Sequence, residues 1–286
     1  QLTNHTGMNP VKLVVLLTEQ DDSVAAAEND VNQQVSTYQF TPPMDPQYIR
    51  HWHLHDALND TEFDSRASTR TEEAWRLMDG FGDPDVVVCV TDDGCKLDHG
   101  DFNSTAKFAQ WGYLRGTRLV TRNDIDADPT EMYKSGSNHG TSCCGVIAGE
   151  VDGALTVGAA PDCRLLPIQW ESSGPSLFIS DSKLMTVLNF IADKVDVMSN
   201  SWGSSPFGNW PTAVVNKIRQ LSETGGTRGK GIVFLWAAGN ENCPIEHTSS
   251  QDIPFTRGAE RQGGSLVWVG VQTSRVFRHN LVHEPG

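Results

Sequence analysis

Short apolar, β-branched runs alternate with helix-like segments along most of this chain, and this alternation constrains the fold more than any other feature. The strand candidates are 86–91, 164–169, 195–200, 231–237 and 265–271. The helix-like segments are 67–78, 139–149, 182–194 and 211–224. Strands that are apolar on both faces are typical of a parallel sheet with helices on both sides. We therefore predict an α/β fold, a three-layer doubly wound parallel sheet.

The first 43 residues have a different character. Segment 12–17 predicts a strand and segment 23–34 a short helix, while the proline-rich stretch 41–46 predicts a linker. We expect residues 1–43 to be an N-terminal extension or propeptide remnant, and residues 44–286 to form the main domain. In the helix expected at 67–78, we place Trp75 and Leu77–Met78 on the apolar side.

Charge and hydropathy exclude several classes of function. The 286 residues carry 36 Asp and Glu against 22 Lys and Arg, a net charge of −14. This balance argues against nucleic-acid binding and against a polybasic membrane anchor, since both need a cationic face. The longest apolar runs, 86–90 and 231–238, are far shorter than the ~20 residues that span a bilayer. Divalent cations or cationic substrates remain compatible partners.

Polar residues at three points along this pattern carry the candidate chemistry. Asp92 ends a buried strand, His139 starts a helix of small residues, and Asn240 follows another buried strand. Sites in such sheets lie beyond the carboxyl ends of the strands. An Asp can orient a His that acts as a general base, and an amide can donate to an oxyanion. These are the parts of an acyl-transfer site without its nucleophile.

The residues around these three positions resemble the subtilisin-like serine proteases (peptidase family S8), and within them the kexin-like branch. The matching segments are Val90-Thr-Asp-Asp-Gly94, His139-Gly-Thr-Ser-Cys-Cys-Gly145, Ser199-Asn-Ser-Trp-Gly203, Trp236-Ala-Ala-Gly-Asn240 and His51-Trp-His-Leu54. The resemblance covers roughly residues 44–275. It implies a subtilisin-like fold and a serine endopeptidase that hydrolyses extended peptide or protein substrates.

The resemblance also implies a role for each matching residue. Asp92 would orient His139, His139 would be the general base, and Asn240 would donate to the oxyanion. Segment Ser201-Trp202-Gly203 would pair with the substrate backbone. Asp93 would contact a basic residue one position before the cleaved one.

Calcium is the cofactor that the resemblance implies. Asp101 matches the family's calcium-ligating Asp, although Gly100 stands where the family has Pro. The acidic run 123–128 lies where kexins also carry acidic residues, and hard oxygen ligands suit Ca²⁺. A solvated acidic loop explains that run equally well.

The nucleophile is missing from the printed sequence. In the family, the Ser lies in a Gly-Thr-Ser-x-x-x-Pro pattern well after the oxyanion Asn, and nothing after Asn240 matches it. Ser142 belongs to the His segment, and Ser265 lacks the pattern. We expect this chain to be inactive in isolation, with the Ser supplied by a second polypeptide or a part beyond residue 286.

Other features leave alternatives open. Ser204-Ser-Pro206 replaces the acidic stretch with which kexins bind arginine, so basic specificity would depend on Glu241, Glu246 and Asp252. A Cys143–His139 nucleophile is conceivable. His51, His53 and His55 would share one face of a strand, as a zinc site would need, or would simply be surface histidines.

The main competing function is non-catalytic. A pseudoprotease or peptide-binding fragment could keep the groove and lose the chemistry, although Asp92, His139 and Asn240 are all present. The family is mostly secreted, lumenal or periplasmic, and we expect the same of this chain. No membrane span and no nucleic-acid partner are expected.

Overall fold

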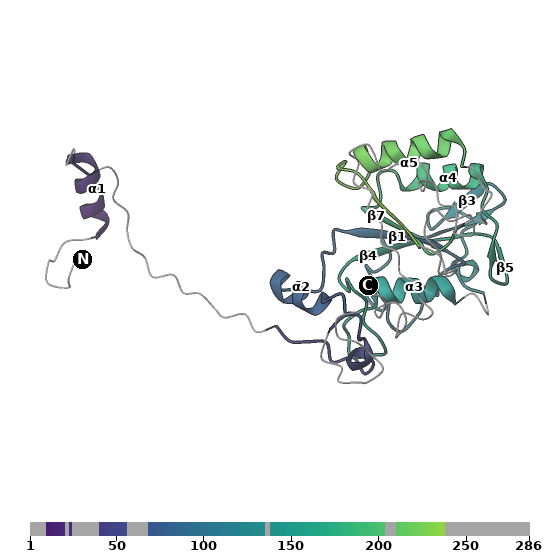
Figure 1. The fold of residues 1–286 in the computed structure, drawn as a ribbon, viewed down its shortest axis with the longest axis horizontal. Coiled ribbons are helices and arrows are strands. Elements are labelled where there is room, and N and C mark those ends of the chain that lie inside the picture. Colours follow the sequence, from purple (N-terminus) through teal and green to yellow (C-terminus); the bar gives the residue numbers. More distant parts are fainter. Residues whose placement is uncertain are drawn as a thin grey trace, which may run out of the picture. The chain divides into compact units, whose positions relative to one another are not determined.

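The computed structural model describes residues 10–20, 23–24, 40–55, 68–134, 138–203 and 210–237 (Figure 1). The chain divides into two compact units, Gln1–Gln39 and Phe40–Gly286. Within the described parts, no helix is both long and apolar enough to cross a membrane. The strand expected at 265–271 lies outside the described residues, and so does all of the helix expected at 23–34 except residues 23–24, which are not helical.

The first unit contains helix α1 (Pro10–Gln20), so the strand predicted at 12–17 is wrong. A six-residue apolar run fits a buried strand or a helix equally well, and periodicity cannot separate the two. Pro10 is the first residue of the helix, a position where the fixed φ of proline favours helix formation.

The second unit is built on a six-stranded sheet with the order β3-β2-β4-β1-β7-β8. Its strands are β1 (Val87–Asp92), β2 (Gly112–Arg115), β3 (Arg118–Thr121), β4 (Arg164–Gln169), β7 (Val197–Asn200) and β8 (Val233–Trp236). β1 is central and pairs in parallel with β4 and β7, while β8 pairs in parallel with β7. The predicted strands at 86–91, 164–169, 195–200 and 231–237 are confirmed with small shifts of their ends.

Helices cover the two faces of this sheet. Helix α3 (His139–Ala148) lies on one face, and helices α4 (Asp181–Ile191) and α5 (Thr212–Thr224) lie on the other (Figure 1). Alternate residues of β1 pack in the apolar clusters on the two faces of the sheet. Val88 and Val90 pack in the cluster that contains Cys144 of α3. Val87 and Cys89 pack in the cluster that contains the apolar faces of α4 and α5. The three-layer α/β fold is therefore confirmed.

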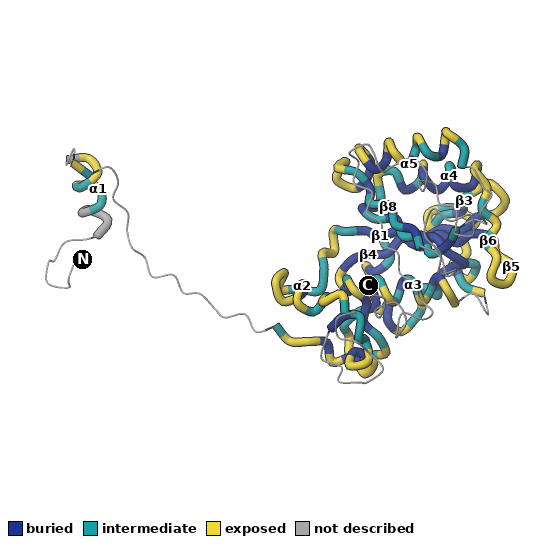
Figure 2. The backbone as a smooth tube through the Cα atoms, viewed as in Figure 1, coloured by how far each residue is buried: buried dark blue, intermediate teal, exposed yellow. Residues whose placement is uncertain are grey.

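Burial follows the same layering. All six residues of β1 are buried, and the middle of the sheet is dark blue in Figure 2. The helices are exposed on their outer sides, as amphipathic segments require.

The hairpin of β2 and β3 was not expected from the sequence. The two strands are antiparallel, so the sheet is mixed at this edge. Gly116, at φ 60°, lies in the tight turn between them, where glycine meets no steric penalty. A second short hairpin joins β5 (Ser172–Ser173) to β6 (Ser176–Leu177). Strands of two to four residues give too little alternation to be read from a sequence.

Helix α2 (Thr71–Met78) is shorter than the predicted 67–78. Trp75 is fully buried, and its indole Nε1 donates to the Ala159 carbonyl at 2.9 Å. The predicted apolar side is wrong for Leu77 and Met78, which are 89% and 60% exposed. Leu77 is two positions from Trp75 and therefore points away from it on a helix. The described residues also include the one-turn 3₁₀ helices η1 (Tyr48–Arg50) and η3 (Pro129–Met132).

A buried hydrogen-bond chain ties the strand ends together. Trp202 Nε1 donates to Thr91 Oγ1 at 2.8 Å, and Thr91 Oγ1 donates to Asn200 Oδ1 at 2.7 Å. Asn200 Nδ2 donates to the Leu235 carbonyl at 3.0 Å. These hydrogen bonds thus link β1, β7 and β8 next to the carboxyl end of β1.

Replacing Thr91 by Val should destabilise the domain by about 2 kcal/mol, because the indole N–H and the amide oxygen each lose a buried partner. Val has nearly the same shape, so packing changes little. Urea unfolding measures the loss. Thr105→Val, at an exposed position, is the control and should change stability by less than about 0.5 kcal/mol. Equal stability of the two variants would contradict the role of the network.

Candidate active site

The end of β1 and the start of α3 bring Asp92 and His139 into direct contact. His139 Nδ1 lies 2.8 Å from Asp92 Oδ1 and 2.9 Å from Oδ2. The Asp92 side chain is 3% exposed, whereas the His139 side chain is 61% exposed. The dyad therefore has a buried carboxylate behind a ring whose other face is open to solvent.

Glycine allows this close approach of the two elements. A Cβ at Gly140 would lie 2.1 Å from the Gly94 carbonyl oxygen and 2.7 Å from Asp92 Cβ. Gly94 itself has φ +131°, and a Cβ there would lie 2.3 Å from the Met132 carbonyl oxygen. A side chain at Gly140 would therefore push α3 away from the end of β1 and lengthen the Asp92–His139 contact, whereas one at Gly94 would clash with the Met132 backbone.

Asp93 holds the amino end of α3. Its carboxylate accepts hydrogen bonds from the backbone N–H of Gly140 at 2.8 Å and of His139 at 3.3 Å. Asn138, the residue at the N-cap position, makes no side-chain capping bond. Asp93 is 8% exposed, and burial raises the pKa of its carboxyl. Sequence reasoning missed this capping role.

The electrostatics of the dyad favour the charged imidazole. The hydrogen bond with Asp92, and to a lesser degree the contact with Cys143, raise the pKa of His139 to about 11. A neighbouring carboxylate stabilises the imidazolium and fixes Nδ1 as the protonated nitrogen. Nε2 is then the nitrogen that can exchange a proton with a reacting group.

The segment after β7 presents its backbone rather than its aromatic side chain. Trp202 is 8% exposed, and its ring packs edge-on against Trp170 at a centroid distance of 5.9 Å. Ser201 and Gly203 are partly exposed. Asn240, the expected oxyanion donor, lies outside the described residues. Its strand β8 is described, and the Ala237 N–H beyond it donates to the Asn200 carbonyl at 3.0 Å.

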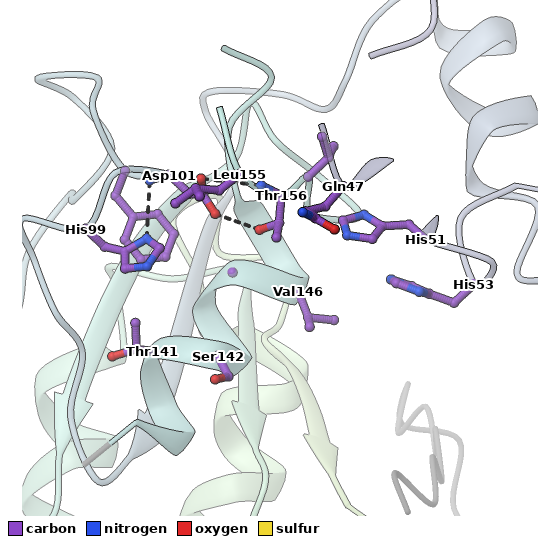
Figure 3. A pocket seen from close by; sticks show the side chains of 13 residues that line it. Gln47, His51, His53, His99, Asp101, Thr141, Ser142, Val146, Leu155 and Thr156 are labelled. Carbon is purple, nitrogen blue, oxygen red and sulfur yellow. Dashed lines mark hydrogen bonds between the residues drawn. The ribbon is translucent and has the colours of Figure 1, made fainter. Parts of the chain in front are cut away.

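Asp101 lies beside the loop that follows α3. Asp101 Oδ2 accepts a hydrogen bond from Thr156 Oγ1 at 2.6 Å, and the carboxylate is 2% exposed (Figure 3). Asp45 Oδ1 accepts from the N–H groups of Asp152 and Gly153 in the same loop, at 3.3 and 3.1 Å. Asp45 Oδ2 is buried without a hydrogen-bond partner. Buried carboxylate oxygens at one loop, one of them unsatisfied, are a donor set that fits Ca²⁺.

A cavity of about 370 Å³ opens next to Asp101, between α3 and the segment that contains His51 and His53 (Figure 3). Neither Asp92 nor His139 lines it. The cavity is thus separate from the dyad, although α3 borders both.

The acidic run 123–128 has protein partners for each of its carboxylates. Arg118 makes a two-pronged ion pair with Asp126, both N–O distances being 2.8 Å. Asp124 accepts from Thr121, and Asp128 caps η3 by accepting from Thr130 N–H at 2.9 Å. These contacts favour the alternative of an exposed acidic loop over a calcium site.

The three alternating histidines lie in turns, not on a strand, so the shared strand face is wrong. The rings of His51 and His53 are nonetheless 5.3 Å apart between centroids. Burial, and repulsion between the neighbouring rings, lower the pKa of His53 to about 4. In the part of the chain that the structure describes, these rings belong to no set of three close metal-ligating groups.

The five described cysteines are all free thiols. Cys144 is fully buried in the core beneath α3, whereas Cys143 is partly exposed and its Sγ lies 3.9 Å from His139 Nδ1. Cys243 lies outside the described residues.

Replacing Asp92 by Asn should lower the pKa of His139, because the carboxylate that stabilises the imidazolium is gone. NMR titration of the imidazole protons measures the shift. In the unaltered chain we expect His139 to stay protonated well above pH 6.5 and the variant to titrate near or below that pH. Asp98→Asn removes an exposed carboxylate paired with Lys96 and should leave the titration unchanged. An identical His139 pKa in both variants would contradict the dyad's electrostatics.

Comparison with known proteins identifies this architecture. The model of the subtilase family (Peptidase S8) matches residues 83–270. A calcium-dependent protease of Nostoc sp. is 30% identical over 70% of this chain and 29% of its own length. Endoprotease bli-4 of Caenorhabditis elegans is 28% identical over 81% of this chain and 23% of its own length. Furin-1 of Xenopus laevis is 24% identical over 80% of this chain and 28% of its own length.

Among solved structures, the serine protease of Aeromonas sobria, crystallised with a chaperone, matches 71% of this chain and 33% of that one. The TM-score is 0.53 and the identity 18%, which supports the fold. The chain spans less than a third of each of the three curated relatives named above. The family match over residues 83–270, together with the similarity to furin-1 and to bli-4, shows that this chain belongs to the subtilase family, on its kexin-like branch.

Proposed function

We propose that this chain is part of a serine endopeptidase that cleaves extended peptide or protein substrates. The observation that carries the proposal is the Asp92–His139 pair, with Nδ1 held by a buried carboxylate and the ring 61% exposed. Because Asp92 holds the proton on Nδ1, Nε2 of the neutral ring is the nitrogen that takes a proton from a nucleophile and later returns it to the leaving amine. A histidine that only stabilised the fold would have no need of this open face.

Each remaining part of the reaction has a proposed residue. The substrate backbone pairs with the backbone of 201–203 as an added strand. Asn240 donates to the oxyanion of the tetrahedral intermediate, a contribution of roughly 2.7–4 kcal/mol in comparable enzymes. Asp93 contacts a basic side chain of the substrate through the lone pairs that its bonds to α3 leave unused.

The nucleophile is proposed to be a Ser outside residues 1–286. Residues 241–286 contain no Gly-Thr-Ser-x-x-x-Pro pattern, and Ser142 bonds the Asn138 carbonyl at 2.9 Å from within the first turn of α3. Without such a Ser, the chain would bind peptides and not cleave them.

A fluorophosphonate probe tests this assignment, because it labels only an activated serine. We expect the active preparation, with all co-purifying polypeptides, to be labelled on a Ser outside residues 1–286. His139→Ala should reduce the labelling rate at least about 100-fold, since the general base is lost. Ser142→Ala is the matched control and should be labelled like the unaltered protein.

Three results would contradict the proposal in different ways. Labelling mapped by mass spectrometry to a Ser within residues 1–286 would overturn the assignment of the nucleophile. Full labelling of His139→Ala would remove His139 from the mechanism. No labelling of any associated polypeptide would favour the peptide-binding alternative.

Calcium is the proposed structural cofactor, with Asp101, Asp45 and the loop after α3 as its binding region. When bound, the ion supplies positive charge that holds these carboxylates together. Two relatives, from Nostoc sp. and Trichormus variabilis, are named calcium-dependent proteases. In the structure, the buried Asp45 Oδ2 has no hydrogen-bond partner among the described residues and is thus an unused oxygen ligand. Family members act in secreted, lumenal or periplasmic compartments, and we propose such a compartment here.

Adding Ca²⁺ should raise the melting temperature of the chelated protein. A ligand at 100 times its Kd stabilises the folded state by about 2.7 kcal/mol. Differential scanning calorimetry with and without a chelator measures the shift. We expect Asp101→Asn to lose most of it and Asp98→Asn, an exposed neighbour, to keep it. Equal shifts in both variants would exclude Asp101 as a ligand.

A further inference from the structure

The cavity of about 370 Å³ beside α3 has no role in the function proposed above. It lies between α3 and the segment that contains His51 and His53 (Figure 3). Neither the Asp92–His139 pair nor Asp45 of the proposed calcium region lines it. The cavity is therefore a further place in this domain where a ligand can bind, and its lining defines the chemistry of that ligand.

His51 contributes a hydrogen-bond acceptor to this lining. Its ring donates to the backbone carbonyl of Val157, which also lines the cavity. Its Nδ1 is buried and bonds to none of the described residues, so the bond to Val157 comes from Nε2. A neutral imidazole has one N–H, and Nδ1 therefore carries a lone pair. Figure 3 shows the His51 ring turned toward Thr156, on the opposite side of the cavity from His99. A ligand that reaches Nδ1 must therefore bring a donor.

The charged groups of the lining favour an uncharged ligand. Burial, and repulsion from His55, lower the pKa of His51. Burial, and repulsion between the rings, lower the pKa of His53 to about 4, so both rings are neutral at pH 7. Asp101 is the one carboxylate among the lining residues, and its oxygens already accept from the Thr156 hydroxyl at 2.6 Å and the Thr156 N–H at 3.5 Å.

Apolar and aromatic side chains form much of the remaining wall. The rings of Phe102 and His99 pack at a centroid distance of 5.6 Å. Val146 and Leu155 are 57% and 49% exposed, so apolar area at the cavity is open to solvent. An engineered cavity of about 150 Å³ holds one benzene molecule. The volume of about 370 Å³ therefore has room for two fused rings, and aromatic walls favour ring-to-ring contacts with such a ligand.

We propose that this cavity binds small uncharged aromatic compounds that carry one hydroxyl or N–H donor, such as phenols and indoles. The donor bonds to Nδ1 of His51, and the ring system covers the apolar side chains of Val146 and Leu155. A water molecule in the same place would satisfy Nδ1 and leave those two side chains exposed. Ca²⁺ prefers a shell of oxygen ligands, which imidazole rings and apolar side chains do not provide.

Two probes that differ chiefly in the donor test the role of His51. 2-Naphthol and 2-methoxynaphthalene share one ring system, but only the naphthol has an O–H. Fluorescence titration of the unaltered chain should show at least tenfold tighter binding of 2-naphthol. His51→Phe keeps an aromatic ring and removes the acceptor, so the two probes should bind it equally. His53→Phe changes a second histidine of the lining and is the matched control, which should keep the preference.

Filling the cavity tests where the probes bind. Gly145 lines the cavity from α3, and a Cβ there would meet no atom within 4 Å. Gly145→Leu should therefore fold, since Leu is also the better helix former, and should weaken 2-naphthol binding at least tenfold. Gly80 lies just after α2, outside the lining, and a Cβ there also meets no atom within 4 Å. Gly80→Leu is thus the matched control and should bind 2-naphthol like the unaltered chain. Thermal unfolding checks that both variants fold.

A third measurement needs no variant, in case the substitutions prevent folding. In methyl NMR spectra of the unaltered chain, 2-naphthol should shift the signals of Val146, Leu155 and Val157 and leave those of Val214 on α5 unchanged. Four results would each overturn the proposed site: no binding of 2-naphthol, equal binding of the two probes to the unaltered chain, undiminished binding to folded Gly145→Leu, and shifts confined to residues outside the lining.

A ligand in the cavity also contacts the helix that presents His139. Thr141 and Ser142 line the cavity from the first turn of α3, so binding there is coupled to the position of His139. This effector role rests on the function proposed above. Saturating 2-naphthol should change the rate of fluorophosphonate labelling of the active preparation at least twofold, and Gly145→Leu should abolish that change.

Failures of the site, of the effector role and of the proposed function are distinguishable. An unchanged labelling rate together with measured binding of 2-naphthol would overturn the effector role alone. Binding of 2-naphthol with no labelling of any polypeptide would overturn the proposed function and leave the site intact.

Discussion

The contact between the carboxyl end of β1 and the first turn of α3 is the interaction on which the rest of the site depends. It consists of two adjacent carboxylates with different partners. Asp92 binds the His139 ring, and Asp93 binds the backbone N–H groups of the same helix turn. The Asp93 bonds fix the backbone at the start of the helix, and this backbone sets the position from which the His139 ring reaches Asp92. Asp93 thus places the helix start, and Asp92 orients the ring.

The sheet explains why this contact lies where it does. β1 is central, and the chain builds β2, β3 and β4 on one side of it before crossing to β7 and β8 on the other. Ligands in such sheets bind where the strand order reverses, beyond the carboxyl ends of the strands. The Trp202–Thr91–Asn200 hydrogen bonds join the strands at that same end. The Asp–His pair and the segment proposed to hold the substrate are therefore fixed to one framework.

The helix that presents His139 also borders the proposed calcium region. His139 begins the helix, and the loop that follows the helix meets Asp101 and Asp45. One element thus links the proposed general base and the proposed calcium region. This arrangement gives a physical reason to expect that ion binding in that region changes the behaviour of His139.

The sequence by itself determined the type and order of the main elements and the identity of the dyad. Apolar runs such as 86–91 and 164–169, which alternate with helix-like segments, predicted the buried strands, and the motifs around Asp92 and His139 are specific to one family. It could not determine α1, because a six-residue apolar run fits a strand or a helix, nor the β2–β3 hairpin, whose strands are too short to show a period. Only the tertiary structure decided that Asp93 caps α3, that the Trp202 ring is core, and that Cys143 Sγ reaches His139 Nδ1. The physical reason is that these are contacts between segments far apart in the chain or choices of side-chain direction, and neither is encoded in local periodicity.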